Sequence, residues 1–351
     1  MTFDDFSIKL FEFLKKRDAE HLNNLLDQSK KHFIDSLRLV DEACFSSFKS
    51  VPGKGADKKN KVVDIIEKRI QQSASDVAII INGKKHCGQT KLYHYLFDKP
   101  ELTCLVIDKN ESFYRMRSAR ENGYDFFDNS GMFVINYTKE NLLGQYRFNR
   151  QGIPALYVAD HLYGCWEETR RPDLLRVNCC RITNVSEMRV LRLYIDNAYT
   201  SIEGLLLAWL AMVCSYNVNN DKNKFKFEYA VPNIILDMMR YHNNECKDDK
   251  KIHGIKYLSS KYQFTDEIQF AGIKSLFYNY VFPSMEDFMS KSKGDDLKTK
   301  FKVTKGFSLT FYQIHSLDFM TQATWTSSYS TSIFHAMEQQ LKKEKAEYVK
   351  G

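Results

Sequence analysis

Three side chains that could do chemistry lie within residues 147–172, RFNRQGIPALYVADHLYGCWEETRRP. Arg147 precedes a Gly-Ile-Pro turn, and Tyr157 lies in the strand-like run ALYVA. Glu168 stands toward the end of a helix expected over 160–169, with the first of these residues, an aspartate, as its N-cap. A cation, a phenol and a carboxylate are thereby set on consecutive elements.

This combination suits cleavage at a sugar carbon near a phosphate. Arginine binds a phosphate or a carboxylate through its planar guanidinium. A carboxylate near an anomeric carbon can stabilise an oxocarbenium-like transition state or orient the attacking water. From the residues alone, a surface arginine, a core tyrosine and a helix-end glutamate in an ion pair are an equally good interpretation.

The order of these residues resembles a known family. The run R-x-N-x-x-G-I-P-x-L-Y-x-A-D, with Glu168 eleven residues after Tyr157, is similar to the central signature of the RES domain, which is named for its Arg, Glu and Ser. Two details differ or leave a choice. Tyr146 stands where the family commonly has Gly, and Glu167 adjoins Glu168, although the spacing and the following Thr-Arg favour Glu168.

The flanking segments match in the order that the family requires. FYRMR (113–117) resembles the opening strand, whose arginine would be Arg115, and HGIKYLSS (253–260) resembles the G-I-[RK]-Y-x-S element. The serine would be Ser259, or Ser260 if the register shifts by one. Two more segments extend the resemblance to about residues 110–283, namely FEYAVPNIILDMM (227–239), with Asn233 where Gln is frequent, and Tyr278-Asn279-Tyr280, which resembles a late strand carrying an asparagine.

The resemblance implies a fold and an activity. RES domains resemble ADP-ribosyltransferase toxins, so we expect an α+β protein with an ADP-ribosyltransferase-like split β-sheet core. They deplete NAD by breaking the nicotinamide–ribose bond, which implies a toxin of a toxin–antitoxin or antiphage defence system, with NAD as substrate and no cofactor or metal. The resemblance implies that Glu168 stabilises the ribosyl cation and directs the acceptor. It implies that Arg147 and Arg115 hold the pyrophosphate or the nicotinamide ribose, and that Asn149 binds NAD. Tyr157 would pack against the nicotinamide or its ribose, and Ser259 would position a ribose hydroxyl or orient Arg147.

Two alternatives stay open. The same residues could transfer ADP-ribose to a protein or nucleic acid, because water, phosphate and macromolecules cannot be separated as acceptors from the sequence. In another class, the N-terminal helices could make the chain a non-catalytic interaction or sensing module. These helices are also candidates for self-association or for binding an antitoxin.

Other motifs favour structural interpretations. NGKKHCGQT (82–90) nearly fits a P-loop, but Gln89 replaces the lysine that contacts the β- and γ-phosphates. Arg17 and His21 have a spacing near that of HEPN-type RNases, and an exposed polar helix face explains them better. His161 is expected to be an exposed first-turn residue. No G-x-G-x-x-G follows a strand, which excludes a Rossmann dehydrogenase.

The remaining pattern predicts the elements that position these motifs. Residues 1–75 are expected to form a helical N-terminal domain with a mobile linker at 50–61. Residues 76–330 form the catalytic domain, and 331–351 a charged C-terminal helix that frays. Short β-rich runs are expected at 77–81, 102–107, 155–159, 175–182 and 189–195, with helices near 161–169, 203–214 and 232–242.

Composition and charge indicate an ordinary globular chain. The 351 residues carry a net charge of +7, without a dense basic block interleaved with aromatics, so nucleic-acid binding is not expected. The eight cysteines contain no C-x-x-C pair, which argues against structural zinc. Reduced thiols and the acidic start MTFDDF predict a cytoplasmic protein. The apolar run 204–214 is too short to cross a membrane and predicts a core helix.

Overall fold

The chain divides into two compact units, which are described here one at a time. Unit 1 comprises Met1–Leu105, Tyr146–Phe148 and Arg189–Ser260, and unit 2 comprises Val106–Gln145, Asn149–Met188 and Lys261–Gly351. Arg17, Gly152 and Ser260 lie outside the described residues. The computed structural model describes residues 1–14, 19–118, 128–133, 146–149, 153–195, 199–216, 226–259, 278–285, 295–308, 329 and 332–349.

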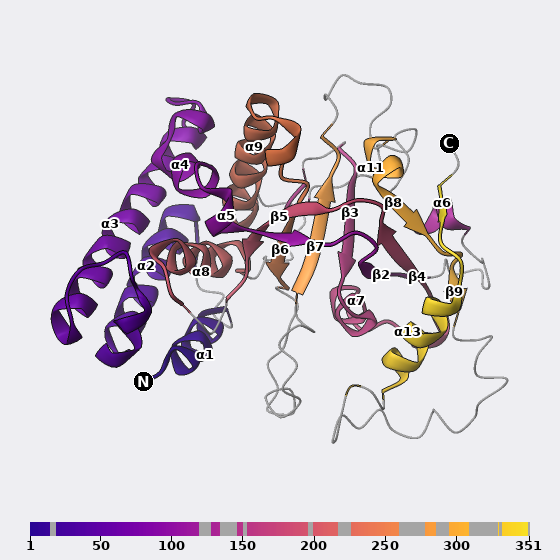
Figure 1. The fold of residues 1–351 in the computed structure, drawn as a ribbon, viewed down its shortest axis with the longest axis horizontal. Coiled ribbons are helices and arrows are strands. Elements are labelled where there is room, and N and C mark those ends of the chain that lie inside the picture. The colour runs from indigo at the N-terminus through magenta and orange to yellow at the C-terminus, as the bar shows by residue number, and fades with distance from the viewer. Residues whose placement is uncertain are drawn as a thin grey trace. The chain divides into compact units, whose positions relative to one another are not determined.

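Unit 1 is built around the apolar helix α8 (Ile202–Cys214), which confirms the predicted core helix. Its side chains from Leu205 to Cys214 are all buried, because the sequence is hydrophobic around the whole helix. Helices α1, α2 and α3 pack on it, and Trp209 Nε1 donates a hydrogen bond to Ser29 Oγ at 3.1 Å (Figure 1). The helices of this layer are α1 (Phe3–Leu14), α2 (Leu22–Arg38), the 3-10 helix η1 (Glu42–Ser47) and α3 (Gly55–Ile81).

The remaining elements of unit 1 include a short parallel strand pair. Strand β5 (Met188–Leu193) pairs with β6 (Gly254–Leu258) in register from Val190↔Gly254 to Leu193↔Tyr257. The others are η2 (Cys87–Gln89), α4 (Lys91–Phe97), α5 (Pro100–Thr103), β1 (Cys104–Ile107), η5 (Phe227–Tyr229), α9 (Ala230–Glu245) and η6 (Asp248–Lys250).

Helix α3 corrects two predictions. The expected linker at 50–61 is helical from Gly55 onward, and the expected strand at 77–81 is the last turn of the same helix. One face of α3 is buried within unit 1, at helical spacing, by Val62, Ile66, Ile70 and Val77. This packing overrides the strand preference of the β-branched run 77–81. A P-loop must follow a strand, and the segment before residues 82–90 is helical, so the P-loop interpretation is excluded as well.

The expected boundary at residue 75 falls inside α3. The N-terminal helices are therefore continuous with the core of unit 1 rather than a separate helical module. The buried rings of Phe3 and Phe6 lie edge-on to Tyr199, and their centroids are 5.2 and 5.5 Å, respectively, from the centroid of the Tyr199 ring. His21, which was considered as an RNase residue, is the N-cap of α2, and its Nδ1 accepts the Asn24 N–H at 3.2 Å.

Unit 2 contains an antiparallel sheet in the order β7-β3-β2-β4-β8-β10, with β9 also on β4. The α+β class is thereby confirmed, and the strands predicted around 113–117, 155–159, 175–182 and 278–280 are present. Their bounds are β2 (Ser112–Ser118), β3 (Ala155–Ala159), β4 (Val177–Asn184), β7 (Tyr278–Pro283), β8 (Phe301–Val303), β9 (Phe307–Ser308) and β10 (Glu347–Tyr348).

Helices α7 and α13 pack on this sheet and on each other (Figure 1). The expected C-terminal helix is present as α13, but it is not a surface helix that frays, because it buries Phe334, Met337 and Leu341 and its last turn is held by Arg181. Arg181 Nε donates to the Leu341 carbonyl at 3.0 Å. The helices of unit 2 are α6 (Asn129–Met132), α7 (Leu162–Glu168), η4 (Leu174–Arg176), α11 (Asp295–Lys300) and α13 (Ile333–Lys343).

Candidate active site

Glu168 is the last residue of α7, and its carboxylate is held by a side chain from β7. Asn279 Nδ2 donates a hydrogen bond to Glu168 Oε1 at 2.6 Å. Asn279 is 3% exposed, whereas Glu168 is half-buried. A buried amide that donates to a carboxylate fixes its orientation through a charge-assisted hydrogen bond. Glu168 is therefore an oriented carboxylate that retains contact with solvent.

Tyr157 shares a sheet face with Asn279. In β3 and β7, Tyr157 pairs with Val281 and Ala159 pairs with Asn279. Directly paired residues lie on the same face, and alternate residues along a strand do so too. The half-buried Tyr157 therefore lies on the face that carries Asn279, the partner of Glu168. The structure brings the predicted phenol and carboxylate to one face of unit 2.

Arg115 performs a backbone role beside this face. Its Nη1 donates to the carbonyl of Tyr157 at 2.8 Å. Strand β2 pairs with β3 at Tyr114↔Ala159, so the register assigns the Cβ of Arg115 to the face opposite Tyr157. The guanidinium thus donates a hydrogen bond to the main chain of β3. The contact described for the Arg115 guanidinium is therefore to the main chain of Tyr157.

Glu167 and Glu168 have different surroundings. The Glu167 side chain is 3% exposed, accepts a hydrogen bond from the hydroxyl of Tyr163, and receives Arg171 Nε on both oxygens at 3.1 and 3.0 Å. These partners belong to α7 and to the residues that follow it. Glu167 is thus tied to its own helix end, whereas the Glu168 carboxylate is bound by Asn279 from β7.

Helix α7 ends in a strained backbone directly after Glu168. Arg170 and Arg171 have φ values of +67° and +52°, a region that favours glycine. The Arg171 N–H donates to the Trp166 carbonyl at 2.8 Å and the Arg170 N–H to the Glu167 carbonyl at 3.0 Å, which is a Schellman motif without the usual glycine. Such strain often accompanies functional sites.

Replacing Arg170 with glycine is expected to stabilise the protein. Relief of the left-handed conformation should raise the free energy of unfolding by about 1 kcal/mol, as measured by urea denaturation. Arg176→Gly provides a control on an exposed side chain in a 3-10 helix, where stability should not rise. A destabilised Arg170→Gly protein would show that the arginine side chain contributes more than its backbone costs.

Arg147 caps a helix in unit 1. Its Nη1 donates to the Cys214 carbonyl and its Nη2 to the Tyr216 carbonyl at 3.0 Å. Cys214 is the last residue of α8, where carbonyls lack partners within the helix and form the negative end of its dipole, and Tyr216 lies two residues beyond. Arg147 is 7% exposed, and its guanidinium lies 5.8 Å from the Tyr229 ring centroid.

Ser259 and Asn149 are both buried. Ser259, in unit 1, is 4% exposed and directly follows β6, where Ser215 Oγ donates to the Leu258 carbonyl at 3.0 Å. Asn149, in unit 2, is 2% exposed, and its Nδ2 donates to the Ile153 carbonyl at 2.8 Å. This bond joins Asn149 to the residue two positions before β3.

The cysteines and His161 add no nucleophile to this site. Burial raises the pKa of the Cys180 thiol to about 12 and raises that of Cys165 as well, so both are protonated at neutral pH. His161 is not the exposed residue expected, because its side chain is 26% exposed and it is the N-cap of α7. Within the described residues, no cluster of metal-ligating side chains is present.

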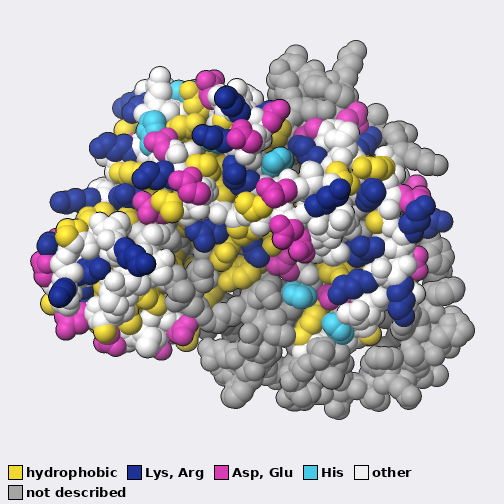
Figure 2. Space-filling model, viewed as in Figure 1, with side chains coloured by type: hydrophobic (Ala, Val, Ile, Leu, Met, Phe, Trp, Pro, Cys, Tyr) yellow, Lys and Arg dark blue, Asp and Glu magenta, His cyan; other side chains and the backbone are white. Residues whose placement is uncertain are grey.

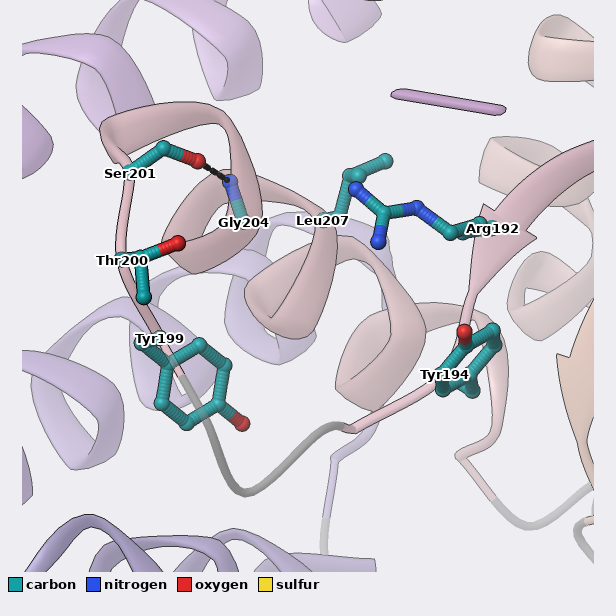
Figure 3. A pocket seen from close by; sticks show the side chains of 7 residues that line it. All are labelled: Arg192, Tyr194, Tyr199, Thr200, Ser201, Gly204 and Leu207. Atoms are coloured by element: carbon teal, nitrogen blue, oxygen red, sulfur yellow. Dashed lines mark hydrogen bonds between the residues drawn. The ribbon is translucent and has the colours of Figure 1, made fainter. Parts of the chain in front are cut away.

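A small cavity lies at the N-terminal end of α8 in unit 1 (Figure 3). Its volume of about 60 Å³ is far below the few hundred Å³ of an ordinary ligand pocket. Ser201 Oγ accepts the Gly204 N–H at 3.1 Å and thereby caps the helix. This cavity cannot hold a dinucleotide. It is lined by Arg192, Tyr194, Tyr199, Thr200, Ser201, Gly204 and Leu207, none of which is a predicted site residue.

On the face shown in Figure 2, Lys and Arg side chains alternate with Asp and Glu over the described surface. This agrees with the modest net charge of +7, and the described part of this face shows no continuous basic patch of the kind that nucleic-acid binding uses. No helix among the described residues is long and apolar enough to span a bilayer.

Asn279 was not identified as a site residue from the sequence. The sequence marked it only as part of a strand resembling one with an asparagine. Its partner Glu168 lies 111 positions away, and no periodicity connects residues at that distance. The hydrogen bond joins a side chain of β7 to a side chain of α7, and it can be inferred only when the pairing of β3 with β7 is known.

Comparison with known proteins found two similarities. Residues 113–263 match the family model described as the RES domain. Over 237 residues the chain is 25% identical to a Bacillus subtilis (strain 168) protein named "Putative toxin YopC". The match covers 56% of this chain and 49% of that relative, so it spans about half the length of the curated protein. No solved structure matches the chain.

Proposed function

We propose that the chain is a RES-type toxin that cleaves the nicotinamide–ribose bond of NAD, on the basis of the match of residues 113–263 to the RES domain. The observation that carries the proposal is the Glu168 carboxylate, held by Asn279 at 2.6 Å on the sheet face of Tyr157. The similarity to a protein named as a toxin supports the biological role.

The proposed reaction needs one carboxylate and no acid. The bond from ribose C1′ to the nicotinamide nitrogen breaks, and its electron pair stays on nicotinamide, which leaves as a neutral molecule. Positive charge then develops on C1′ and the ring oxygen, as in glycoside cleavage. Glu168 stabilises this charge, and Asn279 keeps the carboxylate in position. The acceptor, written here as water, adds to C1′ and releases a proton.

The other residues would serve substrate binding. Tyr157, on the face of Asn279, is proposed to pack against the nicotinamide or its ribose. Arg115 holds the carbonyl of Tyr157 and would thereby support that strand. Arg147 and Ser259 keep the NAD-binding roles that the family resemblance implies, and for Arg147 the cap of α8 is a further role.

Asn149 keeps the NAD-binding role that the resemblance implies, and its bond to the Ile153 carbonyl holds it near the start of β3. NAD enters as substrate, so the proposal includes no cofactor. Since NAD is abundant inside cells, we place the protein in the cytoplasm and expect its activity to be restrained. An antitoxin that contacts the helices of unit 1, or self-association through them, is the proposed means.

The test uses the full-length protein with NAD that carries one label in nicotinamide and another in the adenosine half. We expect nicotinamide to be released in proportion to enzyme. Free ADP-ribose identifies water as the acceptor, its phosphate ester identifies phosphate, and label on protein or nucleic acid identifies an ADP-ribosyltransferase. Absence of nicotinamide release with water, with phosphate and with protein or nucleic acid as acceptor would contradict the proposal and favour the interaction-module alternative.

A further inference from the structure

A buried carboxylate from the C-terminal helix lies at the start of α7. Glu338 belongs to α13, 75 residues beyond the end of the RES match at residue 263, and is 3% exposed. Its Oε1 accepts the backbone N–H of Leu162, the first residue of α7, at 2.8 Å. The same oxygen accepts the hydroxyl of Tyr329 and lies 3.7 Å from His161 Nδ1.

This contact replaces a cap that α7 lacks. The N-cap residue, His161, makes no side-chain hydrogen bond to the first turn. The first N–H groups of a helix need acceptors, and a carboxylate there is also favoured by the helix dipole. A buried carboxylate needs hydrogen bonds to offset its lost hydration, and the donors from Leu162 and Tyr329 supply them.

Helix α13 also fixes α7 along its length. The Phe334 ring contacts Tyr163 and Trp166, with centroids 5.5 and 5.4 Å apart. At its other end, α13 is tied to β4, because Arg181 donates to the carbonyls of Leu341 and Glu344. Since α7 is a seven-residue helix, a shift at Leu162 is carried directly to Glu168.

We infer that Glu338 is a positioning residue, which holds the N-terminus of α7 and thereby places the Glu168 carboxylate. The inference rests on the proposed role of Glu168. If Glu338 has this role, the C-terminal segment 332–349 is required for the activity proposed for Glu168. Burial, followed by the neighbouring Glu338, raises the pKa of Tyr329, so its hydroxyl remains protonated and serves as the donor.

The experiment compares Glu338→Leu with Glu338→Gln. Leucine fills the space but accepts no hydrogen bond, whereas glutamine keeps an acceptor oxygen for the Leu162 N–H. Glu344→Leu is the matched control, because Glu344 is an exposed residue that directly follows the same helix. For each full-length variant, kcat and KM for nicotinamide release are measured per folded molecule, and amide hydrogen exchange is followed over residues 162–168.

We expect Glu338→Leu to lower kcat by about 10- to 100-fold with little change in KM, because a misplacement of about 1 Å has such a cost. Its α7 amides should exchange faster. Glu338→Gln should recover most of kcat, and Glu344→Leu should match the wild type. A loss of fold alone would reduce the folded fraction without changing kcat per folded molecule.

Two results would overturn the inference. One is a Glu338→Leu enzyme with wild-type kcat, and the other is unchanged amide exchange over residues 162–168 in that variant. A wild-type protein without nicotinamide release would instead refute the proposed function, and the exchange measurement would still decide whether Glu338 caps α7. If Glu338→Leu does not fold, Glu338→Ala takes its place in both measurements, because alanine also accepts no hydrogen bond from Leu162; unchanged exchange and unchanged kcat in that variant would overturn the inference.

Discussion

Glu168→Gln is expected to lower kcat for NAD cleavage by about a thousandfold. The substitution keeps the size of the side chain and a hydrogen-bond acceptor for Asn279, but it removes the negative charge that would face the developing ribosyl cation. Loss of one well-placed electrostatic group in an active site costs about 10²- to 10³-fold. Nicotinamide release under saturating NAD measures the effect, and thermal unfolding should be close to wild type because Glu168 is half-buried.

Glu167→Gln is the matched control for this substitution. It makes the same chemical change one residue earlier, where the carboxylate is bound by Tyr163 and Arg171 instead of Asn279. We expect kcat to stay within several-fold of the wild type, while the free energy of unfolding falls by about 1–2 kcal/mol. Full turnover by Glu168→Gln together with an inactive Glu167→Gln would exchange the roles of the two residues.

Arg147→Met is expected to lower the free energy of unfolding by about 3 kcal/mol. Methionine cannot donate to the carbonyls of Cys214 and Tyr216, and a buried carbonyl left without a donor costs about 1–3 kcal/mol. Loss of a cation at the negative end of α8 adds to this cost. Urea denaturation of the full-length protein measures the change.

Arg147→Lys separates the cap from a role in NAD binding. A lysine ammonium can donate to the same carbonyls, so much of the lost stability should return. It cannot form the bidentate contact that a phosphate receives from arginine. Wild-type stability with a raised KM would therefore support a substrate contact in addition to the cap. A stable Arg147→Met protein would show that the cap contributes little.

The local elements of the candidate site could be predicted from the sequence. The run ALYVA forms β3 over the residues expected, and the helix after it ends at Glu168. Alternation, turn residues and helical spacing depend on neighbours within a few positions, so a single segment contains all the information needed. The helix start was misplaced by one residue, because His161 rather than Asp160 is the N-cap.

Local patterns failed where distant residues decide the outcome. The run VAIII has a strand preference, yet it ends α3 because Val77 packs in the core of unit 1. The charged tail predicts an exposed helix, yet α13 contributes the buried Glu338 to the start of α7. In both cases the energy of burial against segments far along the chain exceeds the local preference.

The sequence by itself therefore determined the α+β class, the RES resemblance and the residue types around Glu168. The tertiary structure decided which of two adjacent carboxylates is oriented by Asn279, and it assigned Arg147 to the end of α8. The physical reason is that a side chain's chemistry is local, whereas its hydrogen-bond partners come from elements brought together by packing. Glu168 and Asn279, 111 residues apart, meet because α7 and β7 pack on the same strand, β3.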